Sequence, residues 1–250
     1  MAIRFLNCGT LHLPFRDLAH GITCLLVETN QGPVLIDTGL GVGDYLHPSW
    51  LMRFFTAVMR SPRDLNQTAL HQLKRLGYHS TDVHHIVMTH LHIDHTGGLP
   101  DFPHANVYVY QPEYTYIFNR HTEWEYFKAH WAHTPNWSPQ QLKGETWYDF
   151  DAIRIEAFEP EIWLVLLTGH TIGHVGVAIR NRKGWVLHGG DAVPFNMALD
   201  KAPNWISRSI LGSYPHIPRI RKLMKTHPDV QVVGAHMALG FYENSDTGNA

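Results

Sequence analysis

Short apolar runs separated by glycine and asparagine turns dominate the hydrophobic pattern of the chain. Runs of this length, bounded by turn residues, are typical of strands. Turns at Asn7–Gly9 and Asn30–Gly32 join the first three, which predicts an antiparallel opening sheet. The predicted strands are Ile3–Leu6, Ile22–Glu28, Pro33–Asp37, Ile86–Met88, Asn106–Tyr110, Val175–Arg180, Trp185–His188 and Val230–His236.

Helical spacing is found between these runs. The leucines of Asn66–Leu76 fall on one face of a predicted helix, which Gly77 ends. Further helices are predicted from Pro112 onward and over Pro218–Thr226. Strands and helices therefore both contribute, which indicates an α/β protein.

The segment Tyr45–Met59 is apolar nearly all round. A helix that packs one face on a core needs a single apolar stripe, so the excess should line a cavity or an interface. A core helix or a homodimer contact fits this pattern as well as the wall of a substrate pocket does. The aromatic stretch 114–137 is expected mainly to pack, and its histidines, His121, His130 and His133, are expected at the surface or in the core rather than as ligands.

The composition is that of a chain able to bury a substantial core, with 250 residues of which 44% are hydrophobic. We expect a single domain over residues 1–250, because no linker-like stretch divides the chain. The formal net charge is -2 and no run of Lys or Arg is present, which argues against a nucleic-acid partner. A small or neutral substrate fits better.

Two further observations concern the compartment. The N-terminus lacks a basic region followed by a long apolar run, and no apolar stretch reaches membrane-spanning length. We therefore expect a cytoplasmic protein with no membrane partner. Cys8 and Cys24 lie in apolar, strand-like surroundings, which favours free buried thiols over a disulfide or a metal site.

The strand at Ile86–Met88 leads into a dense group of metal-ligand side chains: His90, His92, Asp94 and His95. Alternation along extended backbone directs the first two to one side. A turn at Thr96–Gly98, where glycine tolerates unusual backbone angles, would bring the other two to a second point. The spacing therefore suits two neighbouring metal ions, and imidazole with carboxylate favours zinc, iron, manganese or cobalt.

The motif His-X-His-X-Asp-His before Gly-Gly resembles the signature of the metallo-β-lactamase superfamily, and later motifs extend the resemblance over most of the chain. Gly169-His-Thr-Ile-Gly-His174 matches a second element of that superfamily, in which the first histidine is a ligand. The resemblance implies an αββα sandwich of two mixed β-sheets flanked by helices. It also implies a complete ligand set of His90, His92 and His170 for one ion, Asp94, His95 and His236 for the other, and Asp191 between them.

Two residues outside this set are given supporting roles. By the resemblance, Asp37 lies near the metals and orients a ligand, although an Asp in that context is more often a turn former. His174 is expected to be a hydrogen-bonded residue behind the ligands or in the core.

Two cations about 3.5–4 Å apart would share a water, lower its pKa and generate a bridging hydroxide that attacks a carbonyl carbon. Asp94, besides binding metal, would orient this nucleophile and pass its proton to the leaving group. Such a centre suits ester, lactone, thioester and phosphodiester cleavage. The sequence therefore predicts a binuclear metal-dependent hydrolase with two divalent ions, zinc above all.

The choice of substrate follows from comparison within the superfamily. The bridging Asp191 argues against β-lactam hydrolysis, only 59 residues follow it where glyoxalase II has a longer helical part, and RNA-binding elements are not found. The layout, with the apolar segment Tyr45–Met59, is most similar to the N-acyl homoserine lactonases. A glyoxalase II-like thioesterase or another ester or phosphodiester hydrolase is the alternative.

One position departs from the lactonases, which commonly place a tyrosine three residues beyond the bridging aspartate. This chain has Pro194 there, so either Tyr242 or Asn196 supplies the hydrogen bond to the substrate carbonyl, or the substrate differs. An iron-dependent persulfide dioxygenase is the alternative from another class, but such an enzyme needs only one metal. A non-catalytic metal-binding module would leave Asp94 unexplained.

Overall fold

The computed structural model describes residues 2–12, 19–119, 126–194 and 216–245. The helices and strands of these residues are β1 (Ile3–His12), β2 (Ala19–Thr29), β3 (Gly32–Ile36), α1 (Val42–Leu46), α2 (Trp50–Val58), α3 (Ala69–Arg75), β4 (His85–Val87), α4 (Ile93–Thr96), β5 (Asn106–Tyr110), α5 (Gln111–Asn119), β6 (Asn136–Gln140), β7 (Glu145–Trp147), β8 (Phe150–Arg154), β9 (Ile162–Leu166), β10 (Val175–Arg180), β11 (Trp185–His188), α8 (Ile217–Thr226), β12 (Val230–Val233), β13 (His236–Ala238) and α9 (Leu239–Ser245). Short 3-10 helices lie at Leu65–Gln67, Ser80–Asp82, Leu99–Asp101, Lys128–Trp131 and Gly190–Ala192.

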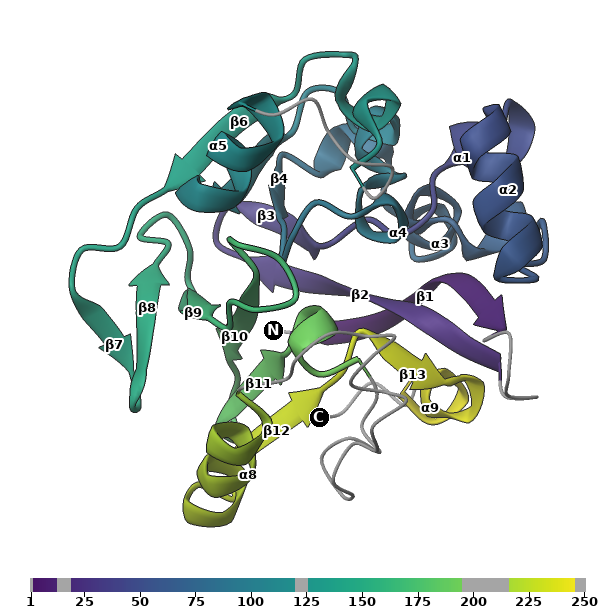
Figure 1. Ribbon diagram of the computed structural model, residues 1–250. Coiled ribbons are helices and arrows are strands. Elements are labelled where there is room, and N and C mark those ends of the chain that lie inside the picture. The colour runs from purple at the N-terminus through teal and green to yellow at the C-terminus, as the bar shows by residue number, and fades with distance from the viewer. Residues whose placement is uncertain (1, 13–18, 120–125, 195–215, 246–250) are drawn as a thin grey trace.

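The first sheet runs in the order β1-β2-β3-β4-β5-β6 (Figure 1). β1, β2 and β3 are antiparallel, as predicted, whereas β3 to β6 are parallel. The turn expected at Asn7–Gly9 is wrong, because these residues lie within β1, where the pairing with β2 shifts register between Asn7 and Thr10. β13 pairs with the first half of β2, beyond the end of β3, through the register His236↔Ile22. β3 and β13 therefore lie end to end along β2, with the start of β13 near the end of β3.

The second sheet runs in the order β12-β11-β10-β9-β8-β7. Its strands are antiparallel except for the pair β11 and β12, which is parallel. Both sheets are therefore mixed, as the superfamily resemblance implies.

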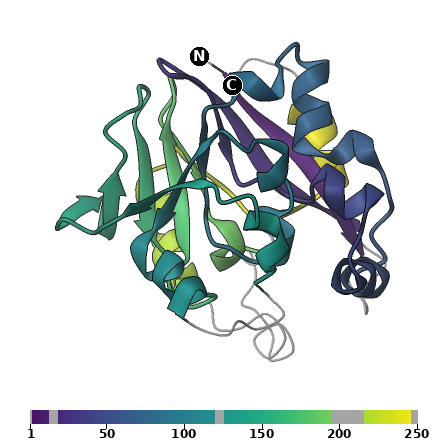
Figure 2. The same ribbon diagram turned by 90° about the horizontal axis from the view of Figure 1, so that it is seen from above.

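The two sheets and their helices form layers (Figure 2). Clusters of apolar side chains fill the spaces between these layers. One cluster, with Leu25 and Val34 from the first sheet and Leu164 and Val177 from the second, fills the space between the two sheets. A second cluster joins the outer face of the first sheet to α3 and α5, and a third joins the outer face of the second sheet to α8. The expected αββα sandwich is confirmed.

Several predicted boundaries are corrected. The helix expected over Asn66–Leu76 is divided, because Thr68 ends the 3-10 helix and then caps α3 by accepting from the backbone N–H of His71. The strand expected over Val230–His236 ends at Val233, and the chain then crosses from the second sheet to the first. His236 therefore begins a strand rather than ending one.

The apolar segment Tyr45–Met59 forms the end of α1 and all of α2, and it has two faces. Tyr45, Met52 and Phe55 are buried in a core cluster against the first sheet. The opposite face exposes Leu46, Trp50, Phe54 and Val58, four residues apart each. The excess of apolar residues predicted from the sequence is thus a stripe on the surface.

Three other expectations concern single features. Cys8 and Cys24 are buried free thiols, as predicted. None of the helices in the described part of the chain combines the length and apolar character needed to cross a bilayer. Most of the described aromatic residues of 114–137 pack in or against the core cluster beside α5, whereas Phe118 is exposed and His121 lies outside the described residues.

Candidate metal centre

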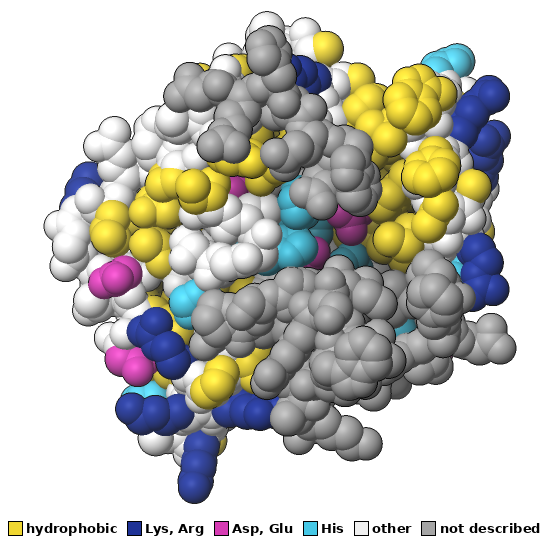
Figure 3. Space-filling model, in the orientation of Figure 1, with side chains coloured by type: hydrophobic (Ala, Val, Ile, Leu, Met, Phe, Trp, Pro, Cys, Tyr) yellow, Lys and Arg dark blue, Asp and Glu magenta, His cyan; other side chains and the backbone are white. Residues whose placement is uncertain are grey.

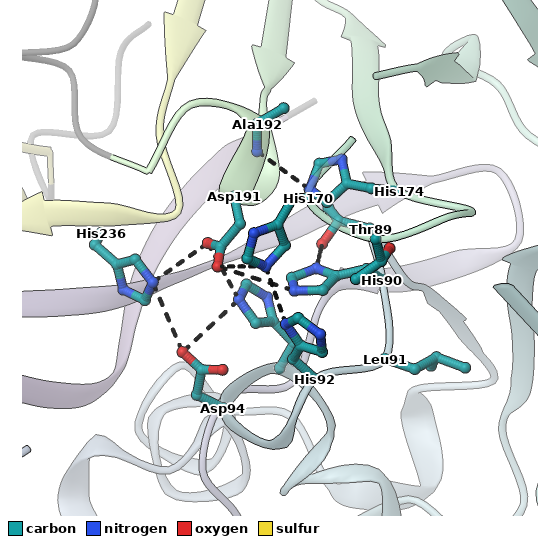
Figure 4. Close-up of polar contacts among 12 residues, drawn as sticks. Thr89, His90, Leu91, His92, Asp94, His170, His174, Asp191, Ala192 and His236 are labelled. Carbon is teal, nitrogen blue, oxygen red and sulfur yellow. Dashed lines mark hydrogen bonds and ion pairs between the residues drawn. The ribbon is translucent and has the colours of Figure 1, made fainter. Parts of the chain in front are cut away.

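Seven side chains from distant parts of the chain converge at one edge of the sandwich (Figure 4). They are the seven that the superfamily resemblance implies as ligands. They form two groups, and within each group the potential ligand atoms lie within 4.8 Å of one another. The first group is His90, His92, His170 and Asp191, and the second is Asp94, His95 and His236.

The first group combines the segment after β4 with the loop between β9 and β10. Nε2 of His170 lies 2.9 Å from Nδ1 of His92 and 3.2 Å from Oδ2 of Asp191. Nε2 of His90 lies 3.9 Å from the same Asp191 oxygen. Three imidazole nitrogens therefore face one carboxylate oxygen.

The second group combines α4 with the start of β13. Nε2 of His236 lies 3.6 Å from Oδ2 of Asp94, and Nε2 of His95 lies 3.9 Å from that oxygen. The crossing of the chain between the two sheets is what brings His236 to this point. Two imidazoles and one carboxylate again converge.

Asp191 lies between the two groups, in the short 3-10 helix that follows β11. Its Oδ2 faces the first group, whereas its Oδ1 lies 3.3 Å from Nε2 of His236 and 3.5 Å from Nε2 of His95. One carboxylate thus offers one oxygen to each group, which is the arrangement of a bridging ligand.

The residues fit a pair of cations on chemical grounds. Nε2 of His90, Nε2 of His95 and Oδ1 of Asp191 are buried and form no hydrogen bond with any described residue. Buried polar atoms in folded proteins are almost always satisfied, so three such atoms facing one space indicate a missing partner. Neutral imidazole and carboxylate together are ligands for zinc and related transition metals.

The electrostatics of the group favour different protonation states at different rings. Burial lowers the pKa of His90, and burial together with the neighbouring His170 lowers the pKa of His92 to about 3. Burial also disfavours a proton on His170, but the adjacent Asp191 outweighs it and raises the pKa of this ring. His90 and His92 are therefore held neutral, the form that binds metal.

Asp37 lies behind the second group, as expected from the resemblance. Its Oδ2 lies 2.8 Å from Nδ1 of His95, while its two oxygens accept hydrogen bonds from the backbone N–H and the hydroxyl of Thr89 at 2.8 and 2.7 Å. Burial would raise the pKa of this carboxyl, but His95 and His188 outweigh burial and hold the pKa well below its usual value. Asp37 is thus a charged support for His95.

Glu113 contacts two segments of the candidate site, and sequence analysis did not identify this residue. Its side chain is fully buried, and its carboxylate contacts both the segment of His90 and His92 and the loop of His170. An acidic residue in the first turn of a helix is normally explained by the helix dipole. No local pattern distinguishes that use from a buried contact with two remote loops.

The turn that separates the two groups differs from the expected one. It is made by the single helical turn α4, and Gly97 and Gly98 have right-handed helical φ values of -56° and -83°. The glycines are needed for space instead, because a Cβ on Gly97 would overlap a carboxylate oxygen of Asp44. Asp44 Oδ1 in turn lies 2.9 Å from Nε2 of His130, whose Nδ1 lies 2.8 Å from the hydroxyl of Thr96 in α4.

Several other predicted residues can now be placed. His130 is a core residue and not one of the seven, and His174 is buried behind the first group with its Nε2 accepting from the backbone N–H of Ala192 at 3.3 Å. Both agree with expectation. The hydroxyl of Tyr242 lies 2.7 Å from Oγ1 of Thr23, so a structural contact already engages it, and Asn196 lies outside the described residues.

Comparison with known proteins extends the assignment beyond geometry. The sequence profile of the metallo-β-lactamase superfamily matches residues 18–208. The probable metallo-hydrolase Rv2300c of Mycobacterium tuberculosis is 35% identical, over 94% of this chain and 79% of its own length. An N-acyl homoserine lactonase of Bacillus cereus is 29% identical, over 65% of this chain and 59% of its own.

Solved structures show the same fold at lower identity. An N-acyl homoserine lactone hydrolase with the product N-hexanoyl-L-homoserine at its catalytic metal centre has a TM-score of 0.74 at 22% identity, covering 97% of this chain and 95% of that one. The dizinc lactonase AidC has a TM-score of 0.59 at 19% identity, covering 88% and 74%. The chain belongs to the metallo-β-lactamase superfamily and is an enzyme of its metal-dependent hydrolase type.

Proposed function

We propose that the chain is a binuclear metal-dependent hydrolase that opens a lactone, with N-acyl homoserine lactones as its substrate class. The observation that carries this proposal is the orientation of Asp191, whose two oxygens face two separate groups of ligands. In this proposal the seven converging side chains bind two ions, for which their imidazole and carboxylate atoms favour zinc, with iron, manganese or cobalt as the other candidates.

Two divalent ions in this position would lower the pKa of a shared water and polarise the carbonyl of the substrate. Side chains of the protein supply the remaining steps, which are proton transfers. Asp94 lies next to His236 at the rim of the group and is only partly buried, so its carboxylate can meet a substrate. It would accept a proton from the attacking water and deliver that proton to the leaving oxygen of the opened ring.

The apolar surroundings of the centre support an acylated substrate. Hydrophobic side chains gather beside the histidine and carboxylate opening, on the side of α1 and α2 (Figure 3). The exposed stripe of Leu46, Trp50, Phe54 and Val58 belongs to these helices. We propose that an acyl chain lies against this surface while the lactone ring meets the centre.

The substrate proposal also draws on relatives. The Bacillus proteins that match 65% of this chain are named N-acyl homoserine lactonases. Two mycobacterial relatives that match 94% of this chain are each named only a probable metallo-hydrolase. The lactone is thus the substrate class supported by both the curated relatives and the apolar rim.

The test is a substrate panel on the purified, metal-loaded protein. Acyl homoserine lactones of short and long chain should release acid, followed in a pH-stat, and a chelator should abolish the release. A glutathione thioester and a phosphodiester serve as competing substrates, and oxygen uptake with a persulfide tests the oxidase alternative. Turnover of any of these in place of both lactones would reject the lactonase proposal.

A substitution of Asp94 tests whether the activity depends on the candidate metal centre. Asp94→Asn should lower kcat by a factor of about a hundred or more, because general acid–base catalysis contributes on the order of 10²–10⁴. Asp151→Asn, on an exposed position of β8, is the matched control and should retain full activity. Equal activity of the Asp94 variant and the control would remove the role given to Asp94.

A further inference from the structure

Glu113 joins the two loops that supply the histidines of the first group. It lies in the first turn of α5, and its side chain is fully buried. A buried carboxylate is costly unless it is hydrogen bonded on every side. The contacts of Glu113 meet this requirement.

Each oxygen of Glu113 serves one loop. Oε1 accepts from the backbone N–H of Leu91 at 3.0 Å, and Leu91 lies between His90 and His92. Oε2 accepts from the backbone N–H of Gly173 at 3.0 Å and from the hydroxyl of Thr171 at 2.8 Å, next to His170. The carboxylate therefore spans the gap between two segments that are remote in sequence.

A tyrosine adds to the first of these contacts. The hydroxyl of Tyr126 donates to Oε1 at 3.3 Å, and its ring packs edge-on against His92 with the ring centroids 5.1 Å apart. The same oxygen thus holds the backbone before His92 and the ring that packs against it.

Gly173 shows that the loop is built to approach this helix. A Cβ on Gly173 would overlap the backbone N and the Cβ of Glu113. Only glycine lets the loop of His170 lie directly against the start of α5. The close approach at Gly173 and the hydrogen bonds of the Glu113 carboxylate thus belong to the same contact between this loop and α5.

We propose that Glu113 is a positioning residue that fixes the separation of the two ligand loops and thereby sets the affinity of the His90, His92 and His170 position for a metal ion. Its effect is specific to this position, because the hydrogen bonds described for Glu113 do not include one to the segments of Asp94, His95 or His236. Their support comes from Asp37 instead, through His95. The inference rests on the proposed metal binding but not on the lactone substrate.

The chemistry of the side chain predicts which variants fail. In Glu113→Gln, one of the two oxygens becomes an NH₂ group, which faces a backbone N–H in either orientation. One loop therefore loses its acceptor. In Glu113→Asp both oxygens remain, but the side chain is one carbon shorter and cannot reach both loops. Thr171→Val removes a single hydroxyl contact and should have a smaller effect.

The experiment measures metal binding rather than catalysis. Zinc affinity is determined by competition with a chromophoric chelator, and the occupancy of each position by anomalous diffraction from crystals of the loaded variant. For Glu113→Gln we expect the affinity of the first position to fall about 10–100-fold, the range for partners that orient metal ligands. The position of Asp94, His95 and His236 should stay filled.

Glu28→Gln is the matched control, because Glu28 is a hydrogen-bonded carboxylate at the end of β2 that pairs with the start of β3, away from the centre. It should leave both affinities unchanged. Unfolding of the metal-free proteins separates positioning from general stability. A Glu113→Gln protein that loses stability but binds both ions as tightly as the wild type would overturn the proposal, as would equal weakening of both positions.

Hydrolysis of the lactone substrate is measured separately from metal binding. If the wild-type protein binds two ions but opens no lactone, the proposed function fails while the metal affinities still decide the role of Glu113. If the wild type opens lactones and the variant binds zinc normally, the positioning proposal alone is rejected.

Discussion

Nδ1 of His95 lies 2.8 Å from Oδ2 of Asp37, and this contact turns the other ring nitrogen of His95 toward Asp191. A charged acceptor at Nδ1 keeps a proton on that nitrogen and leaves Nε2 free to bind a cation. Asp37 is itself fixed by Thr89 and has a left-handed φ of 56°. Backbone strain is thus accepted at the residue that orients a ligand.

Asp37→Ala should weaken the second metal position about 10–100-fold, because His95 loses the partner that sets its tautomer and orientation. Asp37→Asn is the informative companion, since asparagine tolerates the left-handed backbone but carries no charge. We expect an intermediate loss for Asn, measured by metal analysis after dialysis against a chelator. Full metal content in the alanine variant would show that His95 needs no such partner.

Asp191→Ala removes the carboxylate shared by the two groups. Stabilisation by a metal centre contributes several kcal/mol to a transition state, so loss of the bridge should lower kcat/KM on the order of a hundredfold or more. Metal analysis should show fewer than two ions per chain. Two tightly bound ions in this variant would mean that Asp191 does not connect the groups.

The metal-free protein should be most stable near pH 6.5, the ordinary pKa of histidine. In the folded chain the pKa of His92 is lowered to about 3 by burial and by His170, so the unfolded chain takes up the proton first as the pH falls. The stability that neutral His92 contributes above pH 6.5 is therefore lost as the pH falls from 6.5 to about 3. The loss is about 1.4 kcal/mol per pH unit for each proton.

Above pH 6.5, the stability of the metal-free protein should instead fall as the pH rises. Asp191 raises the pKa of His170 against the effect of burial, so this pair contributes stability below pH 6.5 that is lost as the pH rises through the raised value. Metal ions replace that proton, so loading should stabilise the protein most on the alkaline side. Urea unfolding at several pH values, with and without zinc, measures how stability changes below and above pH 6.5. Metal-free stability that rises steadily with pH would contradict the prediction.

The exposed stripe on α1 and α2 gives a prediction about substrate length. Trp50 is 79% exposed and Phe54 is 61% exposed, so replacing both with serine removes apolar surface without opening the core. If an acyl chain lies there, the double variant should raise KM for long-chain lactones by about tenfold, from a loss of 1–2 kcal/mol of apolar contact. KM for short-chain lactones should not change.

The same variant tests the alternative use of the stripe. A homodimer through Tyr45–Met59 would appear in analytical ultracentrifugation of the wild type and dissociate in the double variant. That result, with chain-length preference unchanged, would assign the stripe to an interface between two copies. Phe118→Ser, at another exposed apolar side chain, is the control for nonspecific effects of surface polarity.

Much of the architecture was predictable because it depends on local spacing. The antiparallel opening sheet, the strand at Asn106–Tyr110 and the helix ending at Thr226 follow from short apolar runs and helical spacing. The division of the helix at Thr68 was not predicted, because a threonine cap and a helical threonine have the same local sequence. Single-residue capping decides such boundaries.

By itself, the sequence identified His90, His92, Asp94 and His95 as candidate ligands, because they follow a strand within a few consecutive residues, and the superfamily resemblance added His170, Asp191 and His236. Only the tertiary structure decided how they are held. His236 reaches the second group by starting a strand of the other sheet, and Glu113 and Asp37 act across gaps of 22 and 58 residues. Such contacts depend on how whole sheets and helices pack, and residue spacing along the chain contains no information about that packing.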